Sequence, residues 1–137
     1  MDIYIDIGIL ADMDQIPRQL FWVASSKRDL LEMPKEVRSE FGHGLYQAQI
    51  GAFPAIGKVL SWFGGRSVVE LVMDDHGNTF RAVYTVRFKE VVIVLHAFQK
   101  KSKSGIKTPK EDMELIHSRL KLAEAMYNEW KHRKENQ

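Results

Sequence analysis

Apolar positions follow strand-like patterns through much of the chain. Apolar and polar residues alternate from Ile3 to Ile7, and the run LFWVA at residues 20–24 is apolar enough for a short buried strand. Three more runs, rich in valine and aromatic residues, occupy residues 68–73, 79–88 and 91–98. Turn residues separate these three runs, so the pattern predicts an antiparallel meander.

Helical spacing is clearest near the C-terminus. Thr108, Pro109 and Glu111 match an N-cap, a first turn and a capping box. The apolar residues that follow recur every three or four positions: Met113, Ile116, Leu120, Ala123, Tyr127 and Trp130. This spacing predicts a long amphipathic helix.

Two shorter helices are expected between the first strand and the meander. Ser26 with Asp29 suggests a capping box, and Pro34 suits the first turn of a second helix. That second helix has an apolar stripe made of Val37, Phe41, Leu45 and Ala48. Gly42 and Gly44 would let the two helices pack closely against each other, and residues 51–67 are expected to form a loop.

Together these elements predict an α+β fold. We expect an N-terminal strand, a helical hairpin, an antiparallel curved sheet of three to four strands and a C-terminal helix. Residues 20–132 would form a single domain, and residues 133–137 a tail. Residues 1–19 would be an N-terminal extension, either an extra edge strand or a loose leader.

Composition narrows the class of protein. The chain has 137 residues, a length typical of one domain, and no cysteine, which excludes disulfides and thiolate sites. No apolar run approaches the roughly 20 residues of a membrane-spanning helix. The first residues carry aspartates where a signal peptide carries basic residues. We therefore expect a cytoplasmic protein with no membrane partner.

Positive charge is concentrated in one segment. Residues 1–20 hold four aspartates and one arginine, whereas five lysines follow the third meander strand: Lys100, Lys101, Lys103, Lys107 and Lys110. Such a cluster suits a polyanion. The alternative is a solvated loop that keeps the protein in solution.

Strand alternation places candidate site residues on one face of the sheet. Arg81 falls on the less apolar face of its strand, and Glu70, His96, Phe98 and Lys100 could join it if the strand register allows. We expect the helices to cover only the other face. The face that carries Arg81 would then be an open, concave surface.

That combination of side chains suits RNA. Cations such as Arg81 and Lys100 neutralise phosphate, and His96 can serve as a general acid or base. Phe98 can stack on a base, with Lys58, Lys101 and Lys103 as further candidates for substrate binding.

Each candidate also has a structural alternative. Arg81 could pair with Glu70 across strands, His96 could be a strand histidine and Phe98 ordinary core. Lys58 could be solvated. Trp62 and Phe63 could line a cleft or cap the core.

Other chemistries find little support in the sequence. The five histidines show no zinc-binding spacing, and no phosphate-binding glycine motif occurs. Asp74 and Asp75 in DDHGN are better explained by a hairpin turn than by metal binding. We expect neither a metal nor a cofactor.

Two stretches carry a resemblance to a known family. FRAVYTV at 80–86 and VVIVLHAFQKKSKSGIKTPKED at 91–112 resemble the RelE/HigB superfamily of bacterial toxins, and especially its phage-derived branch. FWVASSKRDLLEMPKEVR at 21–38 is similar to the same branch. The resemblance covers about residues 20–125.

The resemblance implies a toxin of a type II toxin–antitoxin system. Such toxins are metal-independent endoribonucleases that cut mRNA, usually on the ribosome, and a helix-turn-helix antitoxin neutralises them. By position, Arg81 matches the arginine that contacts the scissile phosphate, His96 matches the histidine of this branch, and Lys100 and Lys101 match its basic strand end. The chain departs from the pattern at Glu70, where related enzymes have lysine, and in lacking a tyrosine soon after Lys101.

Three functions therefore stay open. The first is a ribosome-associated mRNA endoribonuclease. The second is a ParE-like inhibitor of DNA gyrase on the same fold. The third is a non-catalytic relic that keeps only the antitoxin-binding surface, which the departure at Glu70 favours.

Overall fold

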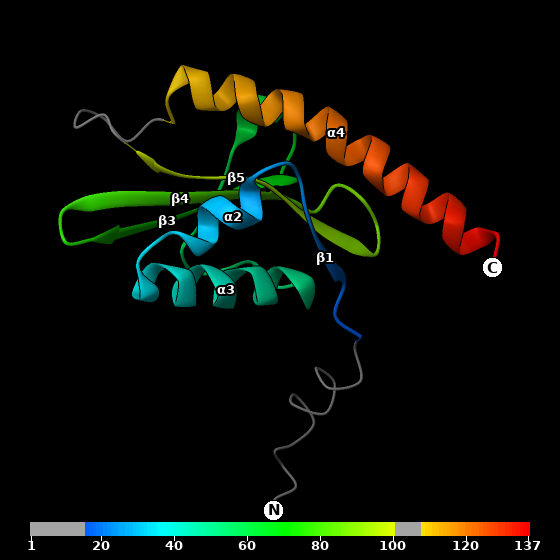
Figure 1. Cartoon of the computed structure of the whole chain (residues 1–137), viewed down its shortest axis with the longest axis horizontal. Coiled ribbons are helices and arrows are strands. Elements are labelled where there is room, and N and C mark those ends of the chain that lie inside the picture. The colour runs from blue at the N-terminus through cyan, green and yellow to red at the C-terminus, as the bar shows by residue number, and fades with distance from the viewer. Residues whose placement is uncertain (1–15, 101–107) are drawn as a thin grey trace, which may run out of the picture.

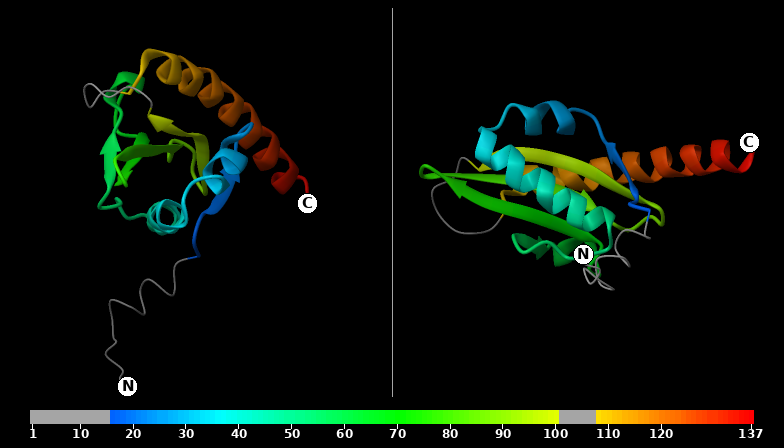
Figure 2. Two further views of the ribbon diagram at one scale, coloured as in Figure 1. Left: turned by 60° about the vertical axis from the view of Figure 1, so that its left-hand side comes forward. Right: turned by 90° about the horizontal axis from the view of Figure 1, so that it is seen from below.

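The computed structural model describes residues 16–100 and 108–137 (Figure 1). In this part of the chain, one five-stranded sheet has helices on both sides (Figure 2). The elements are β1 (Gln19–Trp22), α2 (Ser26–Leu31), α3 (Lys35–Gln49), β2 (Gly57–Val59), the 3₁₀ turn η2 (Ser61–Phe63), β3 (Val68–Asp75), β4 (Asn78–Thr85), β5 (Val91–Lys100) and α4 (Lys110–Glu135).

The expected α+β class is confirmed, while the sheet is larger and more mixed than expected. Its strand order is β1-β5-β4-β3-β2, and β1 pairs with β5 in parallel. The other neighbouring pairs are antiparallel. β2 falls where a loop was expected, because three residues are too few to show a period in the sequence.

The meander depends on a tight turn. Asp75 pairs with Asn78, so His76 and Gly77 form a two-residue connection between β3 and β4. Both have positive φ, 50° and 84°, as a type I′ hairpin turn requires. The turn interpretation of DDHGN is thereby confirmed.

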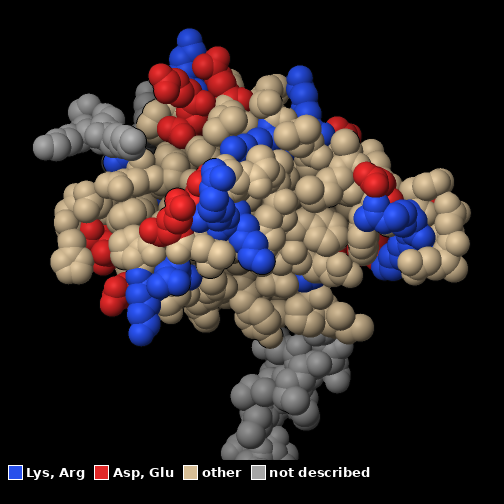
Figure 3. Space-filling model, in the orientation of Figure 1, with Lys and Arg blue, Asp and Glu red and all other residues tan. Residues whose placement is uncertain are grey.

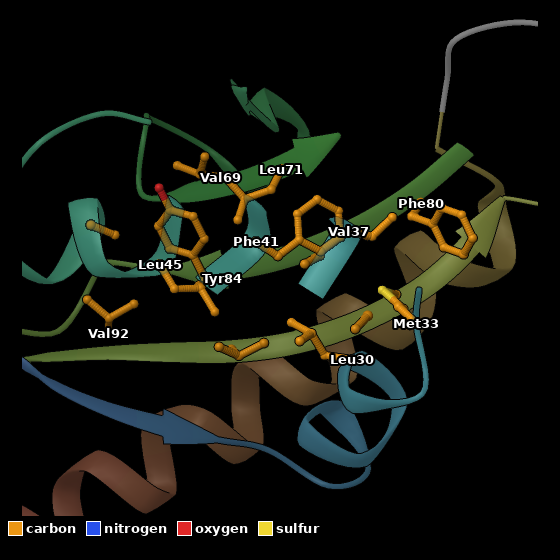
Figure 4. Close-up of a cluster of buried hydrophobic side chains, with 14 residues drawn as sticks. Leu30, Met33, Val37, Phe41, Leu45, Val69, Leu71, Phe80, Tyr84 and Val92 are labelled. Atoms are coloured by element: carbon orange, nitrogen blue, oxygen red, sulfur yellow. The ribbon is translucent and has the colours of Figure 1, made fainter. Parts of the chain in front are cut away.

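One face of the sheet packs against α2 and α3. The apolar stripe expected for α3 is buried as a whole, and it meets Leu71, Phe80, Tyr84 and Val92 from the sheet (Figure 4). Burial also raises the pKa of Tyr84. Gly44 serves this contact, because a Cβ there would lie 3.1 Å from Leu71 Cδ1. The expectation that glycines join the two helices is wrong, since Gly44 faces the sheet.

The opposite face packs against α4. Ile116, Leu120 and Ala123 are buried there with Val83 and Ile93 of the sheet. Figure 2 shows α3 and α4 on opposite sides of the strands. The expectation of an open concave face is therefore wrong. α4 has an apolar stripe of its own, and the second face of the sheet is where that stripe is buried.

The helix starts differ from the expected caps. Pro109 is the N-cap residue of α4 and Ser25 that of α2, and neither helix start has a side-chain cap hydrogen bond. The hydroxyl of Ser26 instead donates to the carbonyl oxygen of Val94 at 3.2 Å. α4 also continues through Glu135, into residues expected to form a tail.

Membrane insertion through a helix is not indicated by this structure. No helix within residues 16–100 and 108–137 has both the length and the apolar character to cross a bilayer.

Candidate functional site

The strand register brings the candidate residues to one face. Glu70 of β3 and His96 of β5 both pair with Val83 of β4, so these three form one row across the sheet. In the next row, Arg81 of β4 pairs with Phe98 of β5. Arg81 therefore lies on the middle strand, two residues from the point where Glu70 and His96 face each other.

A β-bulge decides on which face His96 lies. The register shifts between Val83 and Tyr84, and Leu95 is the additional residue on β5. Leu95 and His96 consequently both lie on the α4 side, and a regular strand would have turned one of them away.

The first polar cluster, called here the arginine cluster, consists of Glu70, Arg81 and Thr108. Arg81 Nη1 donates to Glu70 Oε1 at 2.7 Å, and both side chains are almost fully buried, at 4% and 0% exposure. The Thr108 hydroxyl donates to Glu70 Oε2 at 2.7 Å and accepts a longer bond of 3.4 Å from Arg81 Nη1. The structural alternative for Arg81, a cross-strand pair with Glu70, is thus confirmed, and Thr108 joins this pair just ahead of α4.

The second cluster, called here the histidine cluster, consists of His96, Asp112 and Arg119. His96 Nε2 lies 2.7 Å from Asp112 Oδ1, and Arg119 Nη1 lies 3.3 Å from His96 Nδ1. Arg119 Nη1 also donates to the carbonyl oxygen of Leu95 in the bulge at 3.0 Å, and its Nη2 donates to Ser25 at 3.2 Å. Both clusters therefore fasten α4 to the sheet through polar contacts.

The partners of His96 determine its protonation state. A guanidinium can only donate, so Nδ1 must accept from Arg119, and the ring proton must be on Nε2 facing Asp112. Burial lowers the pKa of His96 below its ordinary value of 6.5, and Arg119 acts in the same direction. The hydrogen bond and charge of Asp112 raise this pKa but do not outweigh the burial. The imidazole is therefore neutral near pH 7.

The remaining candidates lie around these clusters. Phe98 is half-buried and stacks on His96, with ring centroids 4.5 Å apart and planes at 15°. Lys100 is buried at the end of β5 and pairs in register with Thr79, on the same face as Arg81. Lys58 is exposed on β2, opposite Glu70. Lys101 and Lys103 lie outside the described residues, so the lysine segment beyond Lys100 stays a prediction.

A pocket of about 680 Å³ opens beside the arginine cluster. It lies between the segment β2–η2 and the start of α4. Thr108 belongs to both the pocket and the arginine cluster. Figure 3 shows basic and acidic side chains interspersed on the visible face of the molecule rather than gathered into one positive patch.

Asp112, Arg119 and Thr108 were not identified as site residues from the sequence. The positions of Asp112 and Arg119 could have indicated such a role. Asp112 and Arg119 are seven residues apart and flank the apolar stripe of α4, so both point toward the sheet. A charged residue beside a buried stripe is partly buried and needs a polar partner. Such positions are therefore candidates for contacts with polar residues of the sheet. Thr108 gave a misleading signal, because its position resembled an N-cap.

The arrangement places a carboxylate, an imidazole and a guanidinium on one face of the sheet, under the start of α4. Glu70 and His96 lie on the outer strands of a three-strand row, about 10 Å apart by strand spacing, with Val83 between them. Arg81 lies in the next row and binds Glu70. Their polar atoms are occupied by Thr108, Asp112 and Arg119. Within the described residues, no group of three His, Asp or Glu side chains could hold a metal ion.

Comparison with known families identifies the class of protein. Residues 28–121, more than half of the chain, match the family model described as Phage derived protein Gp49-like (DUF891). The chain belongs to this Gp49-like family. It is thereby a RelE/HigB-like toxin family member, and the observed architecture is consistent with a RelE-like fold. A search of curated proteins found no match.

The Gp49-like match covers both clusters completely. It begins within α2 and ends in α4 just beyond Arg119, so Glu70, Arg81, His96 and Asp112 all fall inside it. The polar layer under α4 is therefore part of the family's own segment of the chain.

Proposed function

We propose that this Gp49-like protein is the toxin of a type II toxin–antitoxin pair and cleaves mRNA without a metal. The observation that carries the proposal is the row across the sheet in which Glu70 and His96 flank Val83, with Arg81 in the next row on the same face. A base, an acid and a phosphate-binding cation are the three groups that attack by a neighbouring 2′-hydroxyl requires.

Each residue has one role in the proposed reaction. Glu70 takes the proton of the 2′-hydroxyl, whose oxygen attacks the adjacent phosphorus. Arg81 and Lys100 neutralise the charge that develops on the phosphate. His96 protonates the departing 5′-oxygen. The products are a 2′,3′-cyclic phosphate and a 5′-hydroxyl end, so atoms and protons balance without water or metal.

The start of α4 must move before RNA can reach these groups. Thr108 and Asp112 occupy Glu70 and His96 in the closed state. Thr108 precedes α4 and Asp112 lies in its first turn, so breaking both hydrogen bonds frees the start of the helix while the rest stays docked. His96 then regains contact with water, and its pKa returns toward 6.5, the range that suits an acid at neutral pH.

The experiment is induced expression in bacterial cells with mapping of RNA 5′-hydroxyl ends. The wild-type chain should arrest growth and give cuts within coding sequences, spaced by codons if cleavage occurs on the ribosome. His96→Gln should reduce cutting by about 100-fold or more, which is the usual contribution of a general acid. This variant keeps a donor for Asp112, so its melting temperature should stay close to that of the wild type.

Controls and opposing outcomes are well defined. Thr79→Val removes an exposed hydrogen bond to Asp74 and should leave cutting unchanged. Growth arrest with intact RNA and trapped gyrase–DNA complexes would contradict the nuclease proposal. It would instead indicate a ParE-like inhibitor of DNA gyrase.

A second candidate function is the non-catalytic relic. The burial of the Arg81–Glu70 pair favours it, because a phosphate must compete with a carboxylate already 2.7 Å from the guanidinium. In that case expression would affect neither RNA nor DNA. The chain would still bind a helix-turn-helix antitoxin encoded beside it.

A further inference from the structure

The pocket beside the arginine cluster has a lining that mixes apolar walls with lysines. Val59, Leu60 and Met113 supply apolar surface, and Lys58 and Lys110 stand at its margin. The remaining lining residues are Ser61, Trp62, Thr108 and Glu114. A volume of about 680 Å³ is within the range of small-ligand sites and exceeds what one nucleobase needs.

Trp62 is unusual for its exposure. Its side chain is 62% exposed, the largest exposure among the aromatic residues of the described chain. Its ring neighbours are Phe63 and His117, at interplanar angles of 75° and 57°. Neither neighbour stacks flat on the indole, so the exposed surface is available to a planar group.

The charges at the margin favour an anion. Lys58 and Lys110 are both exposed and lie on opposite walls, one on β2 and one at the start of α4. Glu114 is the one carboxylate in the lining, which leaves an excess of one positive charge. An apolar pocket with cations at its edge fits an aromatic base joined to phosphates.

While the start of α4 is docked on the sheet, the pocket adjoins the row of candidate catalytic groups. Lys58 pairs with Glu70 in the sheet register, and Thr108 contacts both Glu70 and Arg81. A nucleotide bound in the pocket would therefore lie near Arg81, with β3 between β2 and the strand that carries Arg81.

We propose that this pocket binds one unpaired base of single-stranded RNA, stacked on Trp62, with Lys58 and Lys110 holding the flanking phosphates. The identification of RNA rests on the proposed function. The pocket would set which nucleotide lies next to the cleaved bond, so Trp62 is a specificity-determining residue rather than a catalytic one.

Binding can be measured without cleavage. A short fluorescent oligonucleotide with 2′-O-methyl groups cannot be cut, because its attacking hydroxyl is blocked. The probe is used in two forms, one intact and one with abasic positions that keep every phosphate. Each is titrated into the full chain and into variants by fluorescence anisotropy.

The variants should separate stacking from charge. Trp62→Ala should weaken the intact probe by about tenfold or more, the usual effect of removing one stacked aromatic, and should leave the abasic probe unchanged. Trp62→Phe should keep most of the intact-probe affinity. Lys58→Ala and Lys110→Ala should weaken both probes, and the salt dependence of binding should become less steep.

Tyr46→Ala provides the matched control. Tyr46 is 50% exposed but lies on α3, on the opposite side of the sheet, so its removal should change neither probe. Equal loss of affinity in Trp62→Ala and Tyr46→Ala would overturn the proposal. So would equal binding of the intact and abasic probes by the wild-type chain.

The outcome is independent of whether the chain cuts RNA. If the intact probe binds in a way that depends on Trp62, but no cuts occur in cells, the base-pocket proposal would stand. The nuclease proposal would then be wrong. If the wild-type chain and Trp62→Ala cut RNA in cells at the same positions and with the same yield, the nuclease proposal would stand. The base-pocket proposal would then be wrong.

Discussion

Arg81 and Glu70 form an ion pair from which solvent is almost excluded. Such a pair adds little net stability relative to an apolar pair of the same size, because both charges lose their hydration. Removing one partner is a different matter, since it leaves a buried charge uncompensated. The pair therefore has to be kept or replaced as a unit.

Arg81→Ala should lower the free energy of unfolding by about 3–5 kcal/mol, the usual cost of breaking a buried pair. Urea denaturation followed by circular dichroism measures this cost. The comparison is Arg133→Ala, which breaks an exposed pair between neighbouring turns of α4 and should cost about 0.5 kcal/mol or less. Adding Glu70→Gln to Arg81→Ala should restore part of the loss, and equal costs for the two single arginine variants would contradict the burial of the pair.

His96 should make stability depend on pH. Its pKa in the folded state is below 6.5, chiefly through burial, so the unfolded chain binds a proton that the folded chain does not. Stability should therefore fall as the pH falls from about 6.5 through the lowered pKa, and level off below it. His96→Gln should remove this part of the slope in denaturation measured between pH 7.5 and 5.

An exposed histidine supplies the control for that measurement. His76 bonds to Asp75, which raises its pKa, so His76→Gln should remove a slope of the opposite sign. A titration of the His96 ring by NMR gives the direct answer. A midpoint above 6.5 would show that Asp112 outweighs burial, and the neutral form assigned to His96 would be wrong.

At the scale of elements, α4 has two kinds of attachment to the sheet. Its middle is held by the buried apolar stripe and by hydrogen bonds of Arg119, whereas its start is held by the hydrogen bonds of Thr108 and Asp112. The first fully buried residue of α4 is Ile116, so the turn before it has less apolar surface packed on the sheet. The start of α4 is therefore the part that can separate from the sheet while the rest stays docked.

Thr108→Val should loosen the start of α4 selectively. The change keeps the size of the side chain but removes the hydroxyl that donates to Glu70, at a cost of about 1–3 kcal/mol because Glu70 loses a buried partner. Hydrogen exchange by mass spectrometry should show faster exchange over the first turns of α4, with the second half of the helix unchanged. Thr79→Val is the matched control, and faster exchange along the whole helix would instead indicate that α4 detaches as a unit.

The expected and observed elements differ for identifiable reasons. The stripes of α3 and α4 were predictable because helical burial repeats over several turns, and Val37, Phe41, Ile116 and Leu120 lie where their spacing places them. The helix caps were not predictable, because Ser and Thr hydroxyls have several possible hydrogen-bond acceptors. In the fold, Thr108 uses a carboxylate from a distant strand in preference to a nearby backbone amide.

At the scale of the whole molecule, the sheet separates two cores. α2 and α3 close one and α4 closes the other, with β5 contributing to both. Because β1 pairs with β5 in parallel, the segment that enters α2 is tied to the strand that carries His96. The candidate site lies inside the second core, at its polar end. Because α4 covers the site, the site becomes accessible only where α4 separates from the sheet.

The sequence by itself determined the order of the elements, the faces of the helices and the family resemblance. These depend on periodicity and on short contiguous motifs, which need no knowledge of distant contacts. It also placed Arg81 and Glu70 as possible cross-strand partners, since alternation restricts each to one face.

The tertiary structure decided whether that face is open and how its residues are paired. The bulge at Leu95, the partners of His96 and the cover supplied by α4 all join residues far apart in the chain. Such contacts depend on strand register and on helix docking, and both are set by the packing of the whole molecule. No local pattern in the sequence records them.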